Sequence, residues 1–114
     1  MTRVYKILSA AEWSAAEAEG RFTGSAVDLK DGYIHLSTAA QASDTARLHF
    51  AGQTDLVLLE LAAEDLGAAL KWEPSRGGAL FPHLYGPLDP ARVTGVRSLT
   101  LNADGWPDPG PLAP

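Results

Sequence analysis

Two of the three histidines in this chain stand where a side chain can do chemistry. The first, His35, lies in the short apolar stretch Tyr33-Ile34-His35-Leu36. Side chains alternate between the two faces of a strand, so Ile34 and Leu36 are expected to face the core and His35 to face away from it, with Tyr33. An imidazole exchanges protons near neutral pH. His35 is therefore a candidate acid, base or ligand contact.

Ser37 and Thr38 stand two and three residues after His35. Thr38 and Gln41 form a capping-box pattern, which predicts a helix from there to about Phe50. The free N–H groups and the partial positive charge of a helix N-terminus attract phosphate and carboxylate groups. Ser37 and Thr38 are therefore ligand-binding candidates. The alternative is that Thr38 only caps the helix and His35 bonds a nearby carbonyl.

A second cluster lies later in the chain. Alternation places Phe81, His83 and Tyr85 on one face of an extended segment, and Lys71 and Glu73 on one face of another. A carboxylate can orient an imidazole for acid–base work, so Glu73 and His83 are candidate catalytic residues. The alternative is an edge strand with an amphipathic histidine and a surface glutamate.

Other kinds of site have little support in the sequence. His49 is expected in the last turn of a helix, where a cation is favourable, so we interpret it as structural. The chain has no cysteine, no His-Glu-x-x-His spacing, no Gly-x-Ser-x-Gly elbow and no phosphate-binding glycine motif. We expect no metal.

Composition narrows the class of protein further. A length of 114 residues with 46% hydrophobic and 20% charged residues predicts one globular domain. The net charge of −5 disfavours non-specific binding to nucleic acid or to anionic membranes. The N-terminus has no apolar signal-peptide stretch, and no apolar run reaches the ~20 residues of a membrane span. We expect a cytoplasmic protein with no membrane contact.

The hydropathy pattern predicts an α+β fold with a mixed, curved sheet and two helices in the N-terminal half. Strands are expected near residues 4–8, 33–36, 55–61, 70–73, 81–85 and 93–101, helices at 10–19 and 38–50, and a loop at 21–31. Gly95 is expected at a bulge. Residues 1–101 are predicted to form the domain. The proline-rich tail, residues 102–114, is expected to add little to the core, so that deletion from Pro107 onward would cost under ~1 kcal/mol.

The sequence resembles a bacterial family known as domain of unknown function 952. The resemblance runs from about residue 4 to residue 97, and the segments that carry it are residues 4–8 with Trp13, 32–38 with Gln41, 54–60, 71–73 and 81–88. It implies a relationship to the ADP-ribosyltransferase fold, in which a split, curved sheet holds NAD in a cleft. In the branch that this family resembles, two histidines line that cleft. His35 would be the second, and Lys6 stands at the position of the first.

Taken with the resemblance, the residues favour a domain that binds NAD or another phosphorylated nucleotide and transfers ADP-ribose. Catalytic roles are expected for His35, His83 and Glu73. Ligand contacts are expected from Tyr5, Lys6, Ser37, Thr38, Arg76 and Tyr85. Lysine donates hydrogen bonds but does not accept them at neutral pH, which leaves open a second hypothesis, a non-catalytic sensor of a small anionic metabolite. An accessory role with a protein partner is the third.

Overall fold

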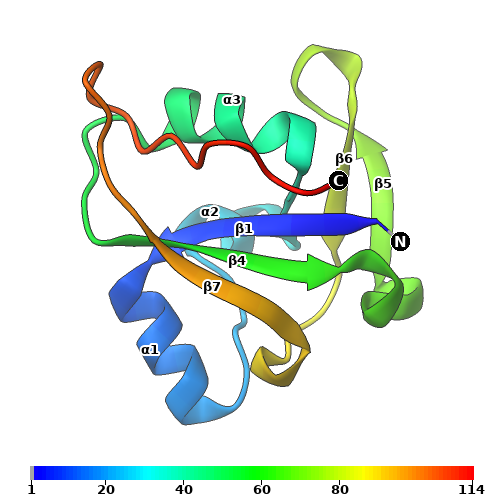
Figure 1. Cartoon of the computed structure of the whole chain (residues 1–114). Helices are drawn as coiled ribbons and strands as arrows, with labels where there is room; N and C mark the ends of the chain where they lie inside the picture. The colour runs from blue at the N-terminus through cyan, green and yellow to red at the C-terminus, as the bar shows by residue number, and fades with distance from the viewer. Residues whose placement is uncertain (1) are drawn as a thin grey trace.

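The strands form two separate antiparallel sheets in the computed structural model, which describes residues 2–114 apart from the side chain of Arg76 (Figure 1). The larger sheet has the order β3-β1-β4-β7. The smaller sheet has the order β2-β6-β5. The strands of the larger sheet are β1 (Arg3–Ser9), β3 (Ser37–Thr38), β4 (Leu56–Ala62) and β7 (Val93–Leu99), and those of the smaller are β2 (Ile34–His35), β5 (Leu70–Pro74) and β6 (Leu80–Leu84).

Local sequence signals set the helix boundaries. The helices are α1 (Ala10–Glu19), α2 (Ala26–Asp31) and α3 (Ala39–His49), with 3₁₀ turns η1 (Ala63–Ala69), η2 (Arg76–Gly78) and η3 (Pro90–Arg92). The capping box predicted at Thr38 is present, and another, formed by Ser9 and Glu12, begins α1. The prediction of a loop over residues 21–31 is wrong for its second half. Ser25 and Asp28 form a further capping box, and Gly32 ends α2 at φ 86°.

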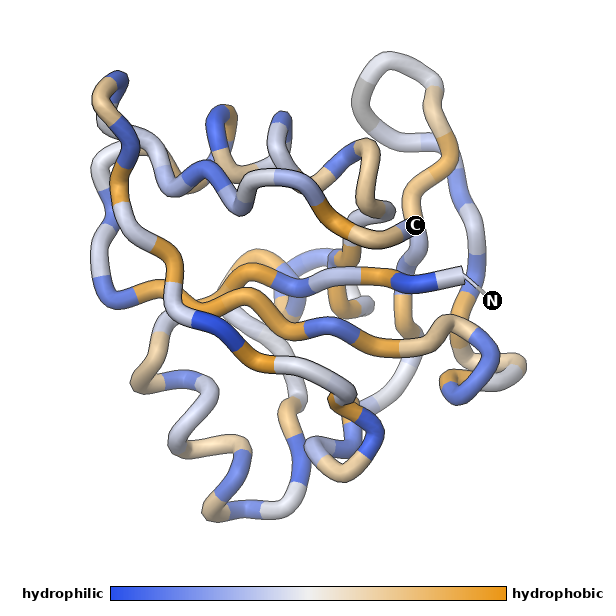
Figure 2. The backbone as a smooth tube through the Cα atoms, viewed as in Figure 1, coloured by the Kyte–Doolittle hydropathy of each residue, from blue (hydrophilic) through white to orange (hydrophobic). Residues whose placement is uncertain are grey.

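The two inner strands of the larger sheet, β1 and β4, are buried on both faces. Leu59 and Leu61 of β4 face α1 and the smaller sheet, whereas Leu58 faces α3 and the end of the chain. In Figure 2 the middle of β4 is mostly orange, as expected for the central strand of a buried sheet. The prediction that residues 55–61 form a central strand is therefore confirmed.

The α+β class is confirmed, but the expectation of a mixed sheet is wrong for the described strands, because every pair that they form is antiparallel. A short turn joins β5 to β6, and such a turn can connect only antiparallel neighbours. The bulge predicted at Gly95 is confirmed. The register of β4 on β7 shifts between Glu60 and Leu61, opposite Gly95 and Val93.

The C-terminal segment, residues 102–114, is irregular but packs against the core, which contradicts the expectation that it adds little. Pro107 and Pro109 are buried, and Trp106 and Leu112 pack against the cluster that contains Tyr5. Figure 1 shows the segment running between α3 and β1. A proline has no backbone N–H to donate to a ladder, but its ring still buries apolar surface.

Candidate functional site

The smaller sheet places two histidines side by side. β2 and β6 are antiparallel, and His35 lies directly opposite His83 in their register. The two imidazole centroids are 5.6 Å apart. The ring of Tyr33 stacks on His83 at 4.1 Å and lies tilted against His35 at 4.6 Å. The structure therefore brings the two predicted histidines into one cluster, with a tyrosine packed on both.

Glu73 orients the imidazole of His83. Its Oε1 lies 2.9 Å from His83 Nδ1 and accepts a hydrogen bond of 2.7 Å from the Tyr85 hydroxyl. The hydrogen bonds from Tyr85 and then from His83 hold the pKa of Glu73 below its ordinary value. The hydrogen bond between Tyr85 and Glu73 raises the pKa of the Tyr85 hydroxyl to about 12. Glu73 is therefore a carboxylate, and His83 donates to it from Nδ1.

The other nitrogen of His83 is left as an acceptor. Among the described residues no buried side-chain nitrogen or oxygen lacks a hydrogen-bond partner. Nε2 of His83 has no hydrogen-bond partner among the described residues. It must therefore be accessible from the surface, although His83 as a whole is only 3% exposed. A neutral imidazole with a fixed Nδ1–H presents its lone pair at Nε2. His83 can thus accept a proton or a hydrogen bond from a bound hydroxyl.

His35 is held differently, between two carboxylates. Its Nδ1 lies 2.6 Å from Asp28 Oδ1, and its Nε2 lies 3.0 Å from Asp31 Oδ2. Asp28 therefore orients the ring from Nδ1, and Asp31 lies beside Nε2 at the exposed edge of the ring. The ring is 31% exposed, so a ligand could still reach it by displacing the Asp31 contact. The geometry therefore suits His35 to donate hydrogen bonds, and His83 to accept them.

Asp28 connects this cluster to the larger sheet. Its buried carboxylate accepts from Lys6 Nζ at 2.9 Å and from the backbone N–H groups of Ser25 and His35. Burial alone would raise the pKa of Asp28. The charge of Lys6 and the hydrogen bonds outweigh burial and hold that pKa below its ordinary value of 3.8. Lys6 and Asp28 form a buried ion pair behind His35.

We expect this ion pair to make stability sensitive to acid. Because the pKa of Asp28 is lower in the folded state, its contribution is complete above the ordinary value and is lost as pH falls through the folded one. The melting temperature should therefore drop below about pH 4 more steeply in the wild type than in a Lys6→Met, Asp28→Asn double variant. Parallel melting profiles of the two proteins over that range would contradict this account.

Comparison with known proteins assigns the chain to a family. Residues 7–96 match the model of a protein family of unknown function, DUF952. The chain belongs to this family. A crystal structure of CC0527 from Caulobacter crescentus is 62% identical, with a TM-score of 0.92 over 94% of each chain. A solution structure of the same protein is 63% identical, with a TM-score of 0.85 over 94% of this chain and 92% of that one. No curated protein matches.

In this DUF952 member, two predicted ligand contacts are bonded within the protein. The Ser37 hydroxyl lies 3.0 Å from that of Thr45, and the Thr38 hydroxyl accepts from the backbone N–H of Gln41. Thr38 therefore caps α3, as the alternative interpretation of the sequence predicts. A contact of either residue with a ligand stays a prediction.

The other residues predicted to contact a ligand do not lie together in the structure. Lys6 Nζ is committed to Asp28, so it supports His35 from behind. Tyr5 points to the opposite face of β1, where its hydroxyl donates to the carbonyl of Ala113. Arg76 falls outside the described side chains. Only Tyr85 joins the cluster, through Glu73 and at 5.2 Å from the ring of Tyr33.

Three residues of the cluster were not predicted as site residues: Asp28, Asp31 and Tyr33. Two signals could have found them. The spacing Ser25-x-x-Asp28 is a capping box, which would have placed α2 and both aspartates just before the strand of His35. The alternation that exposes His35 also puts Tyr33 on its face.

The charges of the cluster indicate which part of a ligand it can accept. The carboxylates of Asp31 and Glu73 are each about a third exposed at its edge. They would repel a phosphate placed directly on the histidines and favour hydroxyl or cationic groups. Within the described residues no group of three or more acidic and histidine side chains has the geometry of a metal site, and no helix is long and apolar enough to cross a membrane.

Proposed function

We propose that this DUF952 protein binds NAD or another phosphorylated nucleotide, with a ribose against His83 and His35 and the phosphates directed away from Asp31 and Glu73. The observation that carries the proposal is the fixed His83 imidazole, whose Nδ1 is held by Glu73 at 2.9 Å and whose Nε2 makes no hydrogen bond with the described residues. A ribose hydroxyl can donate to Nε2 and accept from His35.

Residues near the two histidines offer contacts for the base and the phosphates of the ligand. Tyr85 is 39% exposed and offers an aromatic edge for a base or a nicotinamide ring. Lys71 lies opposite His83 in the register of β5 on β6 and supplies a cation on the same sheet. Arg76 remains the second candidate for a phosphate. A relationship to the ADP-ribosyltransferase fold belongs to this proposal, and the two separate antiparallel sheets support it.

The corresponding reaction is transfer of ADP-ribose. The bond between the ribose anomeric carbon and the nicotinamide nitrogen breaks, and nicotinamide leaves neutral. The oxocarbenium-like state that develops is stabilised by a nearby carboxylate, for which Glu73 and Asp31 are the candidates. An acceptor hydroxyl forms the new bond to the anomeric carbon and gives its proton to the other of these two carboxylates.

Thermal-shift titration with NAD and related nucleotides tests the binding. At a hundred times its dissociation constant a ligand adds ~2.7 kcal/mol of apparent stability. His83→Gln should abolish that gain. The control is His49→Gln, which removes a histidine in the last turn of α3 and should keep the full gain. A gain of equal size in His83→Gln would rule out the site.

One observation favours a second function, a non-catalytic sensor of a small anionic metabolite, whose anionic group would lie away from Asp31 and Glu73. His35 Nδ1 is bonded to Asp28 and its Nε2 lies 3.0 Å from Asp31, so proton transfer through His35 would require the Asp31 contact to be broken. Release of nicotinamide during incubation with NAD separates the two functions. Turnover that disappears in His83→Gln supports the transferase, whereas saturable binding without any nicotinamide supports the sensor.

A further inference from the structure

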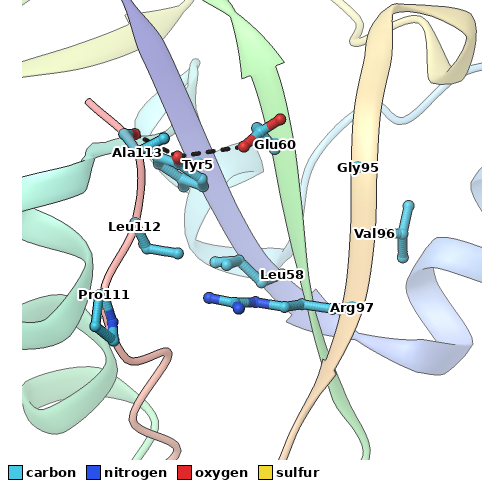
Figure 3. Close-up of a pocket in the computed structure, with 9 residues that line it drawn as sticks. All are labelled: Tyr5, Leu58, Glu60, Gly95, Val96, Arg97, Pro111, Leu112 and Ala113. Atoms are coloured by element: carbon cyan, nitrogen blue, oxygen red, sulfur yellow. Dashed lines mark hydrogen bonds between the residues drawn. The ribbon is translucent and has the colours of Figure 1, made fainter.

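A separate cavity lies on the other face of β1, away from the histidines. It lies between the larger sheet and the C-terminal segment, is partly open to solvent and has a volume of about 260 Å³ (Figure 3). Its floor is formed by Tyr5 and Leu58, and Leu112 closes it from the C-terminal side. Glu60 and Arg97 bring opposite charges to it. No local sequence pattern indicates this site, because its walls come from distant segments of the chain.

Gly95 creates part of the space. Glu60 lies opposite Gly95 across β4 and β7, and Leu58 lies opposite Arg97. A Cβ at position 95 would lie 3.7 Å from Glu60 Cβ and Oε2, an ordinary contact, so a methyl group fits and a larger side chain would extend into the cavity. The missing side chain leaves the Glu60 carboxylate open to a small molecule.

The carboxylate of Glu60 retains capacity to accept a hydrogen bond. Its Oε2 accepts from the Thr94 hydroxyl at 2.9 Å. Its Oε1 lies 3.4 Å from the Tyr5 hydroxyl and 3.7 Å from Arg3 Nε. The single hydrogen of Tyr5 is directed instead to the carbonyl of Ala113, at 2.5 Å. Oε1 therefore has no short hydrogen bond among the described residues.

Arg97 supplies the opposite charge. Figure 3 shows its guanidinium extending past Leu58 towards the C-terminal segment. One NH2 group donates to the carbonyl of Pro109 at 2.5 Å. A guanidinium carries five N–H donors in a fork that matches a carboxylate, so donors remain after this bond. Apolar side chains, Leu58 and Leu112, lie between the two charged groups.

We propose that this cavity binds a small aminocarboxylate, with its carboxylate on Arg97, its ammonium group on Glu60 Oε1 and its carbon chain against Leu58 and Leu112. A zwitterion can contact both charged groups at once, whereas a ligand with one charge can contact only one of them. The volume is below the range of ~300–1,000 Å³ usual for drug-sized ligands, which suits a compact molecule. The site is independent of the nucleotide proposal.

NMR titration of the ¹⁵N-labelled protein with glycine, β-alanine, γ-aminobutyrate and 5-aminovalerate tests this. At least one should give saturable shifts at the amides of Gly95, Gly110, Leu112 and Ala113, with a dissociation constant of about 1 mM or tighter. Acetate and methylammonium, which carry one charge each, should bind at least about tenfold more weakly. No saturable shift with any of the four zwitterions, or equal affinity for acetate, would overturn the proposal.

Matched variants locate the binding. Gly95→Leu fills the cavity and should remove the shifts, whereas Gly95→Ala adds one methyl group and should retain them. Arg97→Gln should weaken binding by about tenfold or more. His83→Gln should leave it unchanged, which separates this site from the nucleotide site. Shifts that survive in Gly95→Leu with a native spectrum, or that map to His35 and His83, would show that the cavity is not the site.

Discussion

Asp28→Asn is expected to destabilise the protein by about 3–5 kcal/mol, the cost of leaving one partner of a buried ion pair without its counter-charge. The Lys6 side chain is 6% exposed and its Nζ lies 2.9 Å from Asp28 Oδ2. Asparagine keeps the shape but only one acceptor oxygen, and the N–H groups of Ser25 and His35 bind different oxygens of Asp28. The loss therefore reports the charge together with one backbone hydrogen bond. Equilibrium urea unfolding measures it.

The double variant Lys6→Met, Asp28→Asn is the control. Removing both charges removes the unpaired ammonium, so much of the stability should return, giving a large coupling energy between the two positions. Arg47→Gln, which breaks an exposed pair with Asp44, should change stability by under ~1 kcal/mol. A loss below ~1 kcal/mol in Asp28→Asn would show that the pair contributes little to the fold.

Deletion of residues 107–114 is expected to cost roughly 2–4 kcal/mol, because burying one apolar side chain stabilises by ~1.5–3 kcal/mol. The deletion removes two buried prolines and the packing of Leu112. It also takes the carbonyl acceptors from Tyr5 and Arg97. The melting temperature should fall by about 10–20 °C, at ~4–8 °C per kcal/mol for a domain near this size.

Ala113→Ser serves as the control for the C-terminal segment. The side chain of Ala113 is exposed, and the change keeps the carbonyl that accepts from Tyr5. Stability should therefore stay within ~0.5 kcal/mol of the wild type. If the truncated protein melts within a few degrees of the full chain, the packing of this segment against Tyr5 contributes little.

Local signals in the sequence predicted most elements. Capping boxes at Ser9 and Thr38 and the apolar run of β4 depend on neighbouring residues only, so they could be read directly. Strand alternation also placed Glu73 and His83 on faces that meet. The position of α2 was missed, because Ser25, Asp28 and Gly32 are typical both of a loop and of a capped short helix.

Contacts between distant segments could not be predicted in the same way. Lys6 reaches Asp28 across 22 positions, and Tyr5 reaches Ala113 across 108. Alternation along β1 separates these two neighbours onto opposite faces, but it does not say what each face meets. The partners follow from how the sheets, α2 and the C-terminal segment pack, which is set by the whole chain.

The ¹⁵N resonances of the histidine rings test the central claim most directly. In the free protein His83 should show the tautomer with its proton on Nδ1, as its bond to Glu73 requires. Titration with NAD should shift the Nε2 signal of His83 in a saturable way and move His35, while His49 stays fixed. A His83 ring that carries its proton on Nε2, or ring signals that do not move at saturating NAD, would contradict the account.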